Sequence, residues 1–265
     1  MSKIYFHADD FGRSEEVSKN ILKCLTKGNL NSVSIMIDHN QKFHKKLIKM
    51  KNINKRLHLN LTELPKKKNN SSIGNLSFIN LLFADEFKKK KIIKEIDIQI
   101  KKFKKIYKPK ELKIDGHEHI HMIPWILDYL IKKRKYYKIK EMRNSNERLM
   151  LPRLKDIFNL RYLRNLIACI IIKILYSFKK PKMNGPCFAG LIYSGMQNKE
   201  TLKKTINFFK KKKIDYFEIL VHPGHVTKKE KLIFKDDYFN FYNSKDRKIE
   251  YDLCFSKELK KELNI

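Results

Sequence analysis

Short apolar runs alternate along the chain with longer stretches whose apolar residues recur at helical spacing. The short runs read as strands at residues 3–8, 32–37, 57–61, 112–116, 138–142 and 217–221. Helical spacing is clearest in residues 87–105 and 201–213. Alternation of single strands with helices is typical of α/β proteins built on a parallel sheet. We therefore expect a (β/α) TIM-like barrel, regular or distorted.

Length and cysteine usage fit one intracellular domain. The chain has 265 residues, and α/β barrels of about 250 residues are commonly single domains, so we expect one domain over residues 1–265. Four cysteines without paired spacing indicate reduced thiols rather than a disulfide framework or a zinc ribbon. Because residues 1–3 lead directly into the first predicted strand, we expect no signal peptide and a cytoplasmic location.

Acidic and histidine side chains stand at or near the ends of four predicted strands. They are Asp9 and Asp10 after the first strand, His58 within the third, Asp115 at the end of the fourth, and His222 after the last. The carboxyl ends of parallel strands converge on one rim, where ligands bind. Taken singly, either aspartate fits a helix cap and His58 fits a hydrogen-bonded core residue. The joint pattern favours a metal site.

The segment after the fourth strand is the richest in histidine. Residues 115–124 read Asp-Gly-His-Glu-His-Ile-His-Met-Ile-Pro, which places His117, His119 and His121 at alternate positions. Alternate side chains of an extended chain point to the same face, so we expect three imidazoles together at the strand end. Imidazole is the commonest protein ligand of borderline transition metals. A chance run of surface histidines is the alternative.

Four blocks of the sequence resemble the YdjC-like carbohydrate deacetylases. They are His-Ala-Asp-Asp-Phe-Gly at residues 7–12, His-Leu-Asn-Leu-Thr-Glu at 58–63, the histidine-rich block at 115–124, and Glu-Ile-Leu-Val-His-Pro-Gly at 218–224. The blocks come in family order and span most of the chain. The family includes chitooligosaccharide deacetylases and proteins associated with hopanoid biosynthesis.

The resemblance implies a divalent-metal hydrolase that removes acetyl groups from N-acetylated amino sugars. Carried over position by position, it assigns Asp10, His58 and His117 to the metal, Asp9 to the general base, His222 to the histidine beside the scissile amide, and Arg143 to an arginine after the fourth strand. It also implies magnesium in some members, and a homodimer.

Amide hydrolysis calls for these residue types on independent grounds. A Lewis acid with open coordination positions lowers the pKa of bound water towards about 7, and one carboxylate with two imidazoles leaves such positions open. A second carboxylate such as Asp9 then receives a proton, and His222 protonates the leaving amine or stabilises the oxyanion. The ligand set favours zinc or another borderline ion, whereas the resemblance points to magnesium. His119 and His121 are candidates for orienting the metal ligands, with packing before Pro124 as the alternative for His121.

The net charge of +32 at pH 7 raises nucleic acid or an anionic membrane as a partner. The excess is mostly lysine, spread over helical stretches that also have an apolar face, so solvated helix faces explain most of it. The sequence has no nucleic-acid motif and no aromatic ladder. We therefore expect no nucleic-acid partner, while the resemblance implies an amino-sugar substrate.

Residues 160–180 read as an apolar helical insertion flanked by basic residues. Its 13 mostly apolar residues from Leu166 to Phe178 are interrupted by Lys173 and fall short of the roughly 20 needed to span a bilayer. We expect this helix to be buried or to form an oligomer contact, with peripheral contact to an anionic membrane as the alternative. Membrane contact would favour a lipid-linked sugar over a soluble oligosaccharide.

Two other functions fit parts of the pattern. A metal-dependent phosphoesterase on the same barrel also uses Asp and His clusters, and paired metals would favour it. A non-catalytic, basic membrane- or nucleic-acid-binding protein would retain the barrel but have no catalytic activity. That alternative predicts that Asp9→Asn and His117→Ala leave function unchanged, whereas neutralising surface lysines abolishes it.

Overall fold

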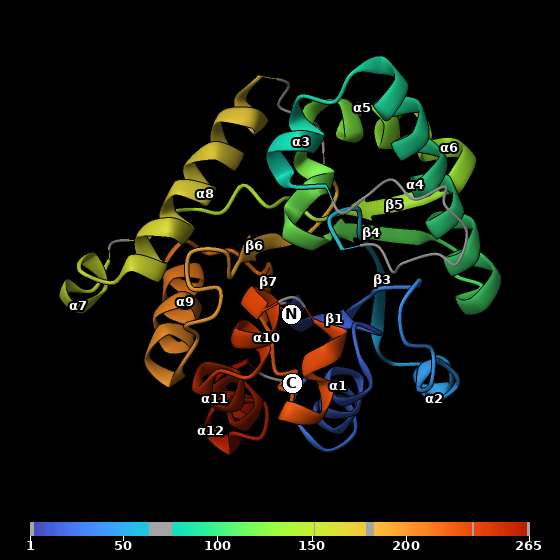
Figure 1. Ribbon diagram of the computed structural model, residues 1–265. Coiled ribbons are helices and arrows are strands. Elements are labelled where there is room, and N and C mark those ends of the chain that lie inside the picture. Colours follow the sequence, from blue (N-terminus) through green and yellow to red (C-terminus); the bar gives the residue numbers. More distant parts are fainter. Residues whose placement is uncertain (1–2, 64–75, 151, 179–182, 235, 264–265) are drawn as a thin grey trace.

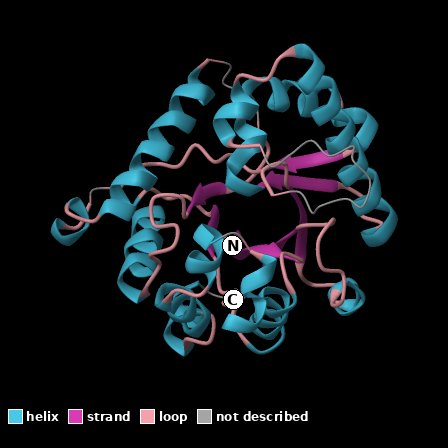
Figure 2. Cartoon of the chain, in the orientation of Figure 1, coloured by secondary structure: helices cyan, strands magenta, loops and turns pink. Residues whose placement is uncertain are grey.

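A parallel sheet of seven strands forms the centre of the protein, and helices surround it (Figure 1, Figure 2). The computed structural model describes residues 3–63, 76–150, 152–178, 183–234 and 236–263. The strands are β1 (Lys3–Phe11), β2 (Ser32–Ile35), β3 (Asn54–Leu59), β4 (Leu112–Gly116), β5 (Ile139–Met142), β6 (Cys187–Ala189) and β7 (Tyr216–Val221). They lie in the order β5-β4-β3-β2-β1-β7-β6, and every pair is parallel.

Helices connect the strands and cover the outside of the sheet (Figure 2). The α-helices are α1 (Glu15–Lys27), α2 (His44–Lys49), α3 (Phe78–Leu82), α4 (Glu86–Tyr107), α5 (Pro124–Lys132), α6 (Arg134–Tyr137), α7 (Leu154–Ile157), α8 (Leu160–Ser177), α9 (Lys199–Lys211), α10 (Asp236–Tyr242), α11 (Lys245–Leu253) and α12 (Lys257–Leu263). Two 3-10 segments are η1 (His117–Met122) and η2 (Lys228–Ile233). In α4 the apolar residues at helical spacing face the core, as predicted, and the lysines between them stay largely at the surface.

The α/β class and all six predicted strands are confirmed, with strand ends that differ by a few residues. A complete eight-stranded barrel is not formed by the described residues, because β5 and β6 are the two edges of an open strand order. One isolated parallel bridge, between Asn144 and Cys187, links the segment after β5 to β6. In the described residues this bridge is the only pairing found between the two edges, so the curled sheet stays open there.

The end of β1 turns sharply into the loop before α1. Asp10 and Gly12 both have positive φ angles, of 72° and 94°. A Cβ atom at Gly12 would lie 2.4 Å from the carbonyl oxygen of Met36, so this turn requires glycine. Aspartate is among the few other residues that tolerate the left-handed region. The turn therefore lets Asp9 and Asp10, although adjacent in sequence, reach different partners at the carboxyl end of β1.

Helix α8 is the helix expected in residues 160–180. Its inner face, with Tyr162, Cys169 and Ile172, packs against Met122 and Phe188 in an apolar cluster that is separate from the main core. The outer face is exposed, so the expected burial holds for one face only. In the described part of the chain, no helix is long and apolar enough to cross a membrane. The lysines at 179, 180 and 182, on the C-terminal side of this helix, lie outside the described residues.

Candidate metal centre

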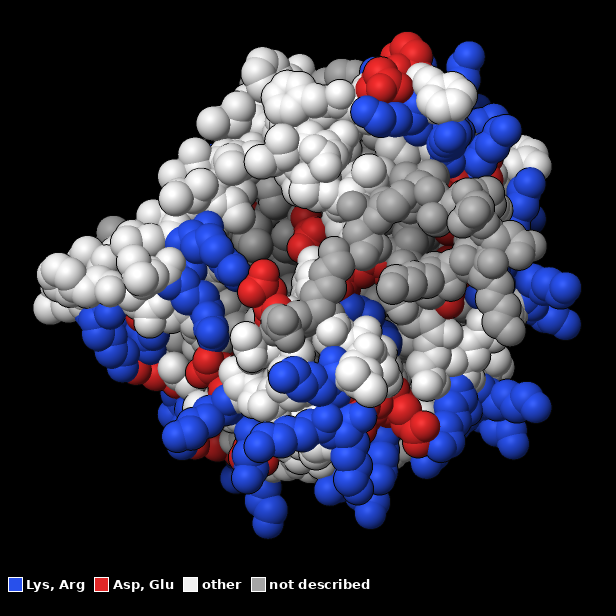
Figure 3. All heavy atoms as spheres, viewed as in Figure 1, with Lys and Arg blue, Asp and Glu red and all other residues white. Residues whose placement is uncertain are grey.

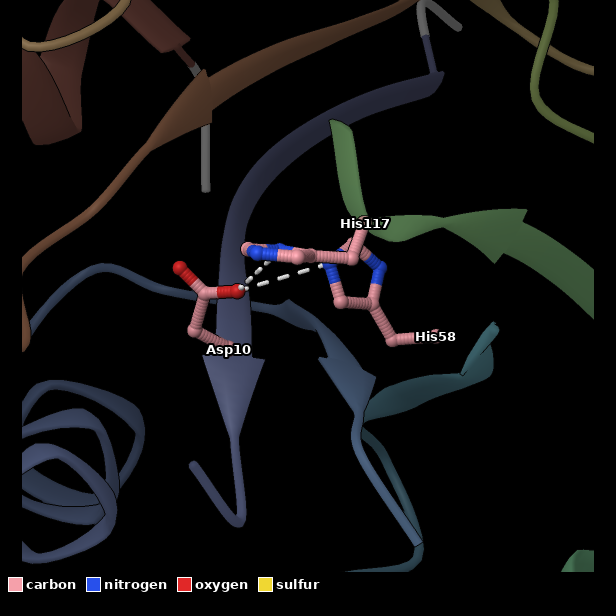
Figure 4. Close-up of side chains that lie close together, drawn as sticks. All are labelled: Asp10, His58 and His117. Atoms are coloured by element: carbon pink, nitrogen blue, oxygen red, sulfur yellow. Dashed lines mark ion pairs between the residues drawn. The ribbon is translucent and has the colours of Figure 1, made fainter. Parts of the chain in front are cut away.

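Asp10, His58 and His117 come together at the carboxyl ends of β1, β3 and β4 (Figure 4). The Oδ1 atom of Asp10 lies 3.4 Å from Nε2 of His58 and 3.2 Å from Nδ1 of His117. All three residues are buried. The convergence predicted from strand ends is thus present, and one ligand atom of each residue lies within 4.8 Å of the others.

The donor atoms of this group fit a bound cation. Oδ1 of Asp10 and Nε2 of His58 are buried and have no hydrogen-bond partner. Leaving such an atom unpaired costs about 1–3 kcal/mol, which a cation at the centre would offset. Nδ1 of His58 lies 2.7 Å from Oδ1 of Asp115, and because the carboxylate can only accept, Nδ1 is the protonated nitrogen. The lone pair of Nε2 is thereby directed at Asp10 and the centre.

Two side chains outside the predicted set orient the ligands. Nε2 of His117 lies 3.1 Å from Oε2 of Glu63, which favours the tautomer with a lone pair on Nδ1. Glu63 also pairs with Arg13. The hydroxyl of Tyr242, in α10, donates to Oδ2 of Asp10 at 2.7 Å, which leaves Oδ1 for the centre. Glu63 lies in the second sequence block, whereas nothing in the sequence singles out Tyr242.

The pKa values show an excess of negative charge at the group. Burial alone would lower the pKa of His58, but the nearby carboxylates of Asp9, Asp10 and Asp115 raise it to about 9. Likewise burial opposes a raised pKa for His117, yet Asp10 and Glu63 hold that pKa well above its usual range. Without a cation the imidazoles themselves would take up protons to balance the carboxylates. A divalent ion would supply the same positive charge and leave them as neutral ligands.

Asp9 lies beside this group but points to a different partner. The guanidinium of Arg143 binds it through two nitrogens, Nη1 at 2.9 Å from Oδ2 and Nη2 at 2.8 Å from Oδ1. His7 Nε2 lies 3.0 Å from Oδ1 of the same carboxylate, and His58 Nε2 lies 4.0 Å from its Oδ2. Burial would raise the pKa of Asp9, but the positive charges of Arg143 and His58 hold it well below the usual range. Asp9 is therefore ionised at neutral pH.

Arg143 is the centre of a buried ion-pair network. Its Nε lies 2.7 Å from Oε1 of Glu218, and its Nη2 lies 3.0 Å from Oδ2 of Asp115. Arg56 approaches the other oxygen of Glu218 at 3.0 Å. Arg143 is fully buried, and its guanidinium is directed at carboxylates of the protein, so it positions Asp9. Glu218 and Arg56 lie inside strands, where only the fold reveals their pairing.

His222 follows β7, next to β1 in the sheet. Ala8 pairs with Val221, so His222 stands level with Asp9 at the same rim. Its backbone amide donates to Oε2 of Glu250 at 2.5 Å, and the ring packs edge-on against Phe241. Burial lowers the pKa of His222, although the charges of Asp10, Glu250 and Asp9 oppose the shift.

The expectation that three alternate imidazoles share one face is wrong. Residues 117–122 form η1, in which Glu118 and His119 have positive φ angles, so the chain is not extended there. A Cβ atom at Gly116 would lie 2.9 Å from Ile120 Cγ1, which shows how tightly the segment folds back. Only His117 reaches the group.

His119 and His121 do not orient the metal ligands. Nδ1 of His119 lies 2.8 Å from the hydroxyl of Ser145. Nε2 of His121 donates to the carbonyl oxygen of Arg143 at 2.8 Å. Burial lowers the pKa of His121 to about 4, so its ring is neutral. Both residues support the segment that carries Arg143.

Known proteins match this chain in sequence and in fold. Residues 3–264 match the family described as YdjC-like protein. A carbohydrate deacetylase of Mus musculus is 25% identical over 154 residues, 53% of this chain and 50% of that protein. A carbohydrate deacetylase of Danio rerio is 26% identical over 134 residues, 46% of this chain and 43% of that protein. The matched part thus spans about half the length of these relatives.

One solved structure shares the fold. It is a protein of Enterococcus faecalis V583 described, provisionally, as a cellobiose-phosphate cleavage protein. The TM-score is 0.66 at 17% identity, and the match covers 99% of this chain and 94% of the other. Because the identity is low, the likeness concerns the arrangement of strands and helices.

Proposed function

Because the chain belongs to the YdjC-like protein family, we propose that it is a divalent-metal hydrolase that removes the acetyl group from an N-acetylated amino sugar. One observation carries the proposal: the converging ligand atoms of Asp10, His58 and His117 lie beside a second carboxylate, Asp9, held by Arg143. Relatives named carbohydrate deacetylase support this reaction class.

Each residue has a role in amide hydrolysis. A divalent ion held by Asp10, His58 and His117 would polarise the acetyl carbonyl and acidify water. Asp9, ionised and fixed by Arg143, accepts the proton of the attacking water. His222, directly after the strand next to β1, stabilises the oxyanion through its ring N–H or passes a proton to the leaving amine.

The donor set is compatible with more than one divalent ion. Two imidazoles and one carboxylate suit zinc and other borderline ions. The resemblance to the family points to magnesium. Metal-stripped protein reloaded with zinc, cobalt or magnesium, one at a time, distinguishes these ions by the activity that each restores.

A phosphoesterase with two metals is the second candidate, because His7, Asp9 and Asp115 form a further group with closely spaced ligand atoms. Arg143 argues against it. Its Nη2 lies 2.8 Å from Asp9 and 3.0 Å from Asp115, so a guanidinium already neutralises the charge that a second metal would bind. A single-metal reaction therefore fits better.

The remaining proposals concern partners and location. The substrate is an amino sugar, either a soluble oligosaccharide or a lipid-linked form, and nucleic acid is not the partner. The family resemblance supports a homodimer, which sedimentation velocity on the full chain tests. The cysteines at 24, 169, 187 and 254 are all free thiols, which supports a cytoplasmic location.

The decisive experiment measures acetate released from N-acetylated amino sugars, with soluble oligomers and lipid-linked forms in the same panel. Metal-stripped wild type, Asp10→Ala and His222→Gln are assayed with each added metal. We expect metal-dependent release that Asp10→Ala loses and that His222→Gln reduces by about 100-fold or more, with metal binding retained in His222→Gln. Metal binding without acetate release from any substrate would reject the deacetylase, and phosphate esters would be assayed next.

A further inference from the structure

The outer surface of α7 and α8 exposes a concentration of large apolar side chains. Residues 154–178 contain ten of the 21 exposed large apolar residues in the described part of the chain. At the α7 end, Leu154 is 84% and Phe158 is 88% exposed. Single apolar residues at a surface are ordinary, whereas a cluster of this kind marks a contact surface.

Along α8 the exposed residues form one stripe opposite the packed face. The buried residues of the helix include Tyr162, Asn165, Cys169 and Ile172. The outward stripe consists of Leu160, Leu163, Ile167, Ile170, Ile171 and Ile174. Both sets recur at spacings of three or four residues, so they lie on opposite sides of the helix. From Leu160 to Ile174 the stripe extends over about 21 Å of the helix.

The charged residues beside the stripe indicate which kind of partner binds it. Residues 160–178 contain Arg161, Arg164 and Lys173 and no acidic residue. By helical spacing Arg164 and Lys173 lie on either side of the stripe, and both are exposed. In Figure 3 the flank formed by α7 and α8, on the left and upper left, is mostly free of acidic side chains.

A second copy of the chain is a poor match for this surface. It would set the same cations against each other, with a net charge of +32 on both partners. An anionic lipid surface offers the opposite charge together with an apolar layer beneath its headgroups. Since no helix of the described residues can cross a membrane, α8 would lie in the surface plane.

We propose that α8 and the end of α7 dock the protein onto an anionic lipid surface. The stripe enters the boundary between headgroups and acyl chains, and Arg164 and Lys173 face the lipid phosphates. The packed face of α8 contacts Met122 of η1, the segment that also carries His117. The docked helix is therefore packed against the segment that carries one of the candidate metal ligands.

The test measures binding of the full chain to vesicles of phosphatidylcholine, with and without 30% phosphatidylglycerol. The variant Ile167→Glu with Ile171→Glu places two acids in the stripe. Phe87→Glu with Ile98→Glu on α4 is the matched control, because it makes the same charge change at two other exposed apolar positions. We expect wild type to prefer anionic vesicles and the stripe variant to bind about tenfold more weakly or worse, with the control close to wild type.

A second measurement separates apolar insertion from adhesion through lysines. Ile170→Trp adds a tryptophan to the stripe, and brominated lipids quench its emission only if the stripe enters the bilayer. Equal binding of the two glutamate variants, or absence of the added quenching, would overturn the proposal in favour of adhesion by net charge. No preference of wild type for anionic vesicles would also overturn it, as would a dimer that the stripe variant dissociates without change in vesicle binding.

Discussion

Arg143 and Asp9 form a buried, two-nitrogen ion pair across the rim of the sheet, with contacts of 2.9 and 2.8 Å. The same guanidinium pairs with Glu218 and Asp115. A planar fork of donors can meet these three carboxylates at once, which a lysine ammonium cannot do with the same geometry. The pair therefore fixes both the charge and the orientation of Asp9.

We predict that Arg143→Lys is folded but impaired. The positive charge stays, but the two-nitrogen contact is lost, so Asp9 is no longer held in one orientation and acetate release falls on the order of 100-fold. Arg143→Ala leaves three buried carboxylates without their partner and lowers the free energy of unfolding by about 3–5 kcal/mol. Steady-state kinetics and urea unfolding measure the two effects. Arg153→Lys is the control, because Arg153 pairs with Asp156 away from the metal centre.

Metal should stabilise the protein through Asp10. At a concentration 100 times its dissociation constant, a ligand that binds only the folded state adds about 2.7 kcal/mol to the free energy of unfolding. We expect this gain in wild type with zinc or magnesium and none in Asp10→Asn, which keeps the shape of the side chain. Asp38→Asn, which removes an ion pair with Lys102, should keep the full gain. Equal stabilisation of Asp10→Asn would place the metal elsewhere.

Glu63 should tune metal affinity through His117. Because Oε2 of Glu63 lies 3.1 Å from Nε2 of His117, Glu63→Gln removes a negative charge that favours the tautomer with the lone pair on Nδ1. Loss of such a partner costs about 10- to 100-fold in metal affinity. Titration calorimetry on metal-stripped protein measures the change. Glu86→Gln, on the exposed side of α4, should leave the affinity as in wild type.

Glu147 should make stability depend on pH. Burial raises the pKa of Glu147 to about 7, and hydrogen bonds from the amides of Ile192, Gly190 and Leu191 only partly oppose it. The folded pKa exceeds that of an unfolded glutamate, about 4.3, so the folded state binds more protons between these values. Its stabilising contribution is therefore complete below about pH 4 and is lost as the pH rises through 7.

Glu147→Gln removes this titration while keeping an acceptor for the amides of Leu191 and Ile192. From pH 5 to pH 8 the free energy of unfolding of wild type should fall relative to the variant by about 3 kcal/mol. Urea unfolding at several pH values measures the difference. Parallel curves for the two proteins would show that Glu147 is ionised in the folded state at pH 5.

The sequence predicts the convergence of the candidate ligands because parallel strands deliver their carboxyl ends to one rim, whereas their assignment to a metal rests on the family resemblance. Asp10 and His117 follow apolar runs at the ends of two strands, and His58 lies within a third strand, where apolar and polar residues alternate from Leu57 to Leu61. Tyr242 could not be found in this way. It reaches Asp10 across 232 residues of chain, from a short helix in which no pattern sets Tyr242 apart from the other aromatic residues.

The expectation that the three histidines after β4 share one face fails for a local reason. A two-residue period indicates a shared face only on extended chain, and Gly116 allows a fold-back that ends the strand before His117. The pattern of apolar residues likewise could not show whether the sheet closes into a barrel. Closure of a curled sheet depends on whether its first and last strands pair with each other, which a local pattern of apolar residues does not report.

The position of β1 in the sheet has a consequence for synthesis on the ribosome. The first strand of the chain pairs with β7, which begins at Tyr216, so one edge of β1 stays unpaired until that strand emerges. At about 5–20 residues per second this delay is roughly 10–40 s. During that time the nascent chain exposes an apolar strand that ends in two adjacent aspartates, and their charge opposes its pairing with other chains.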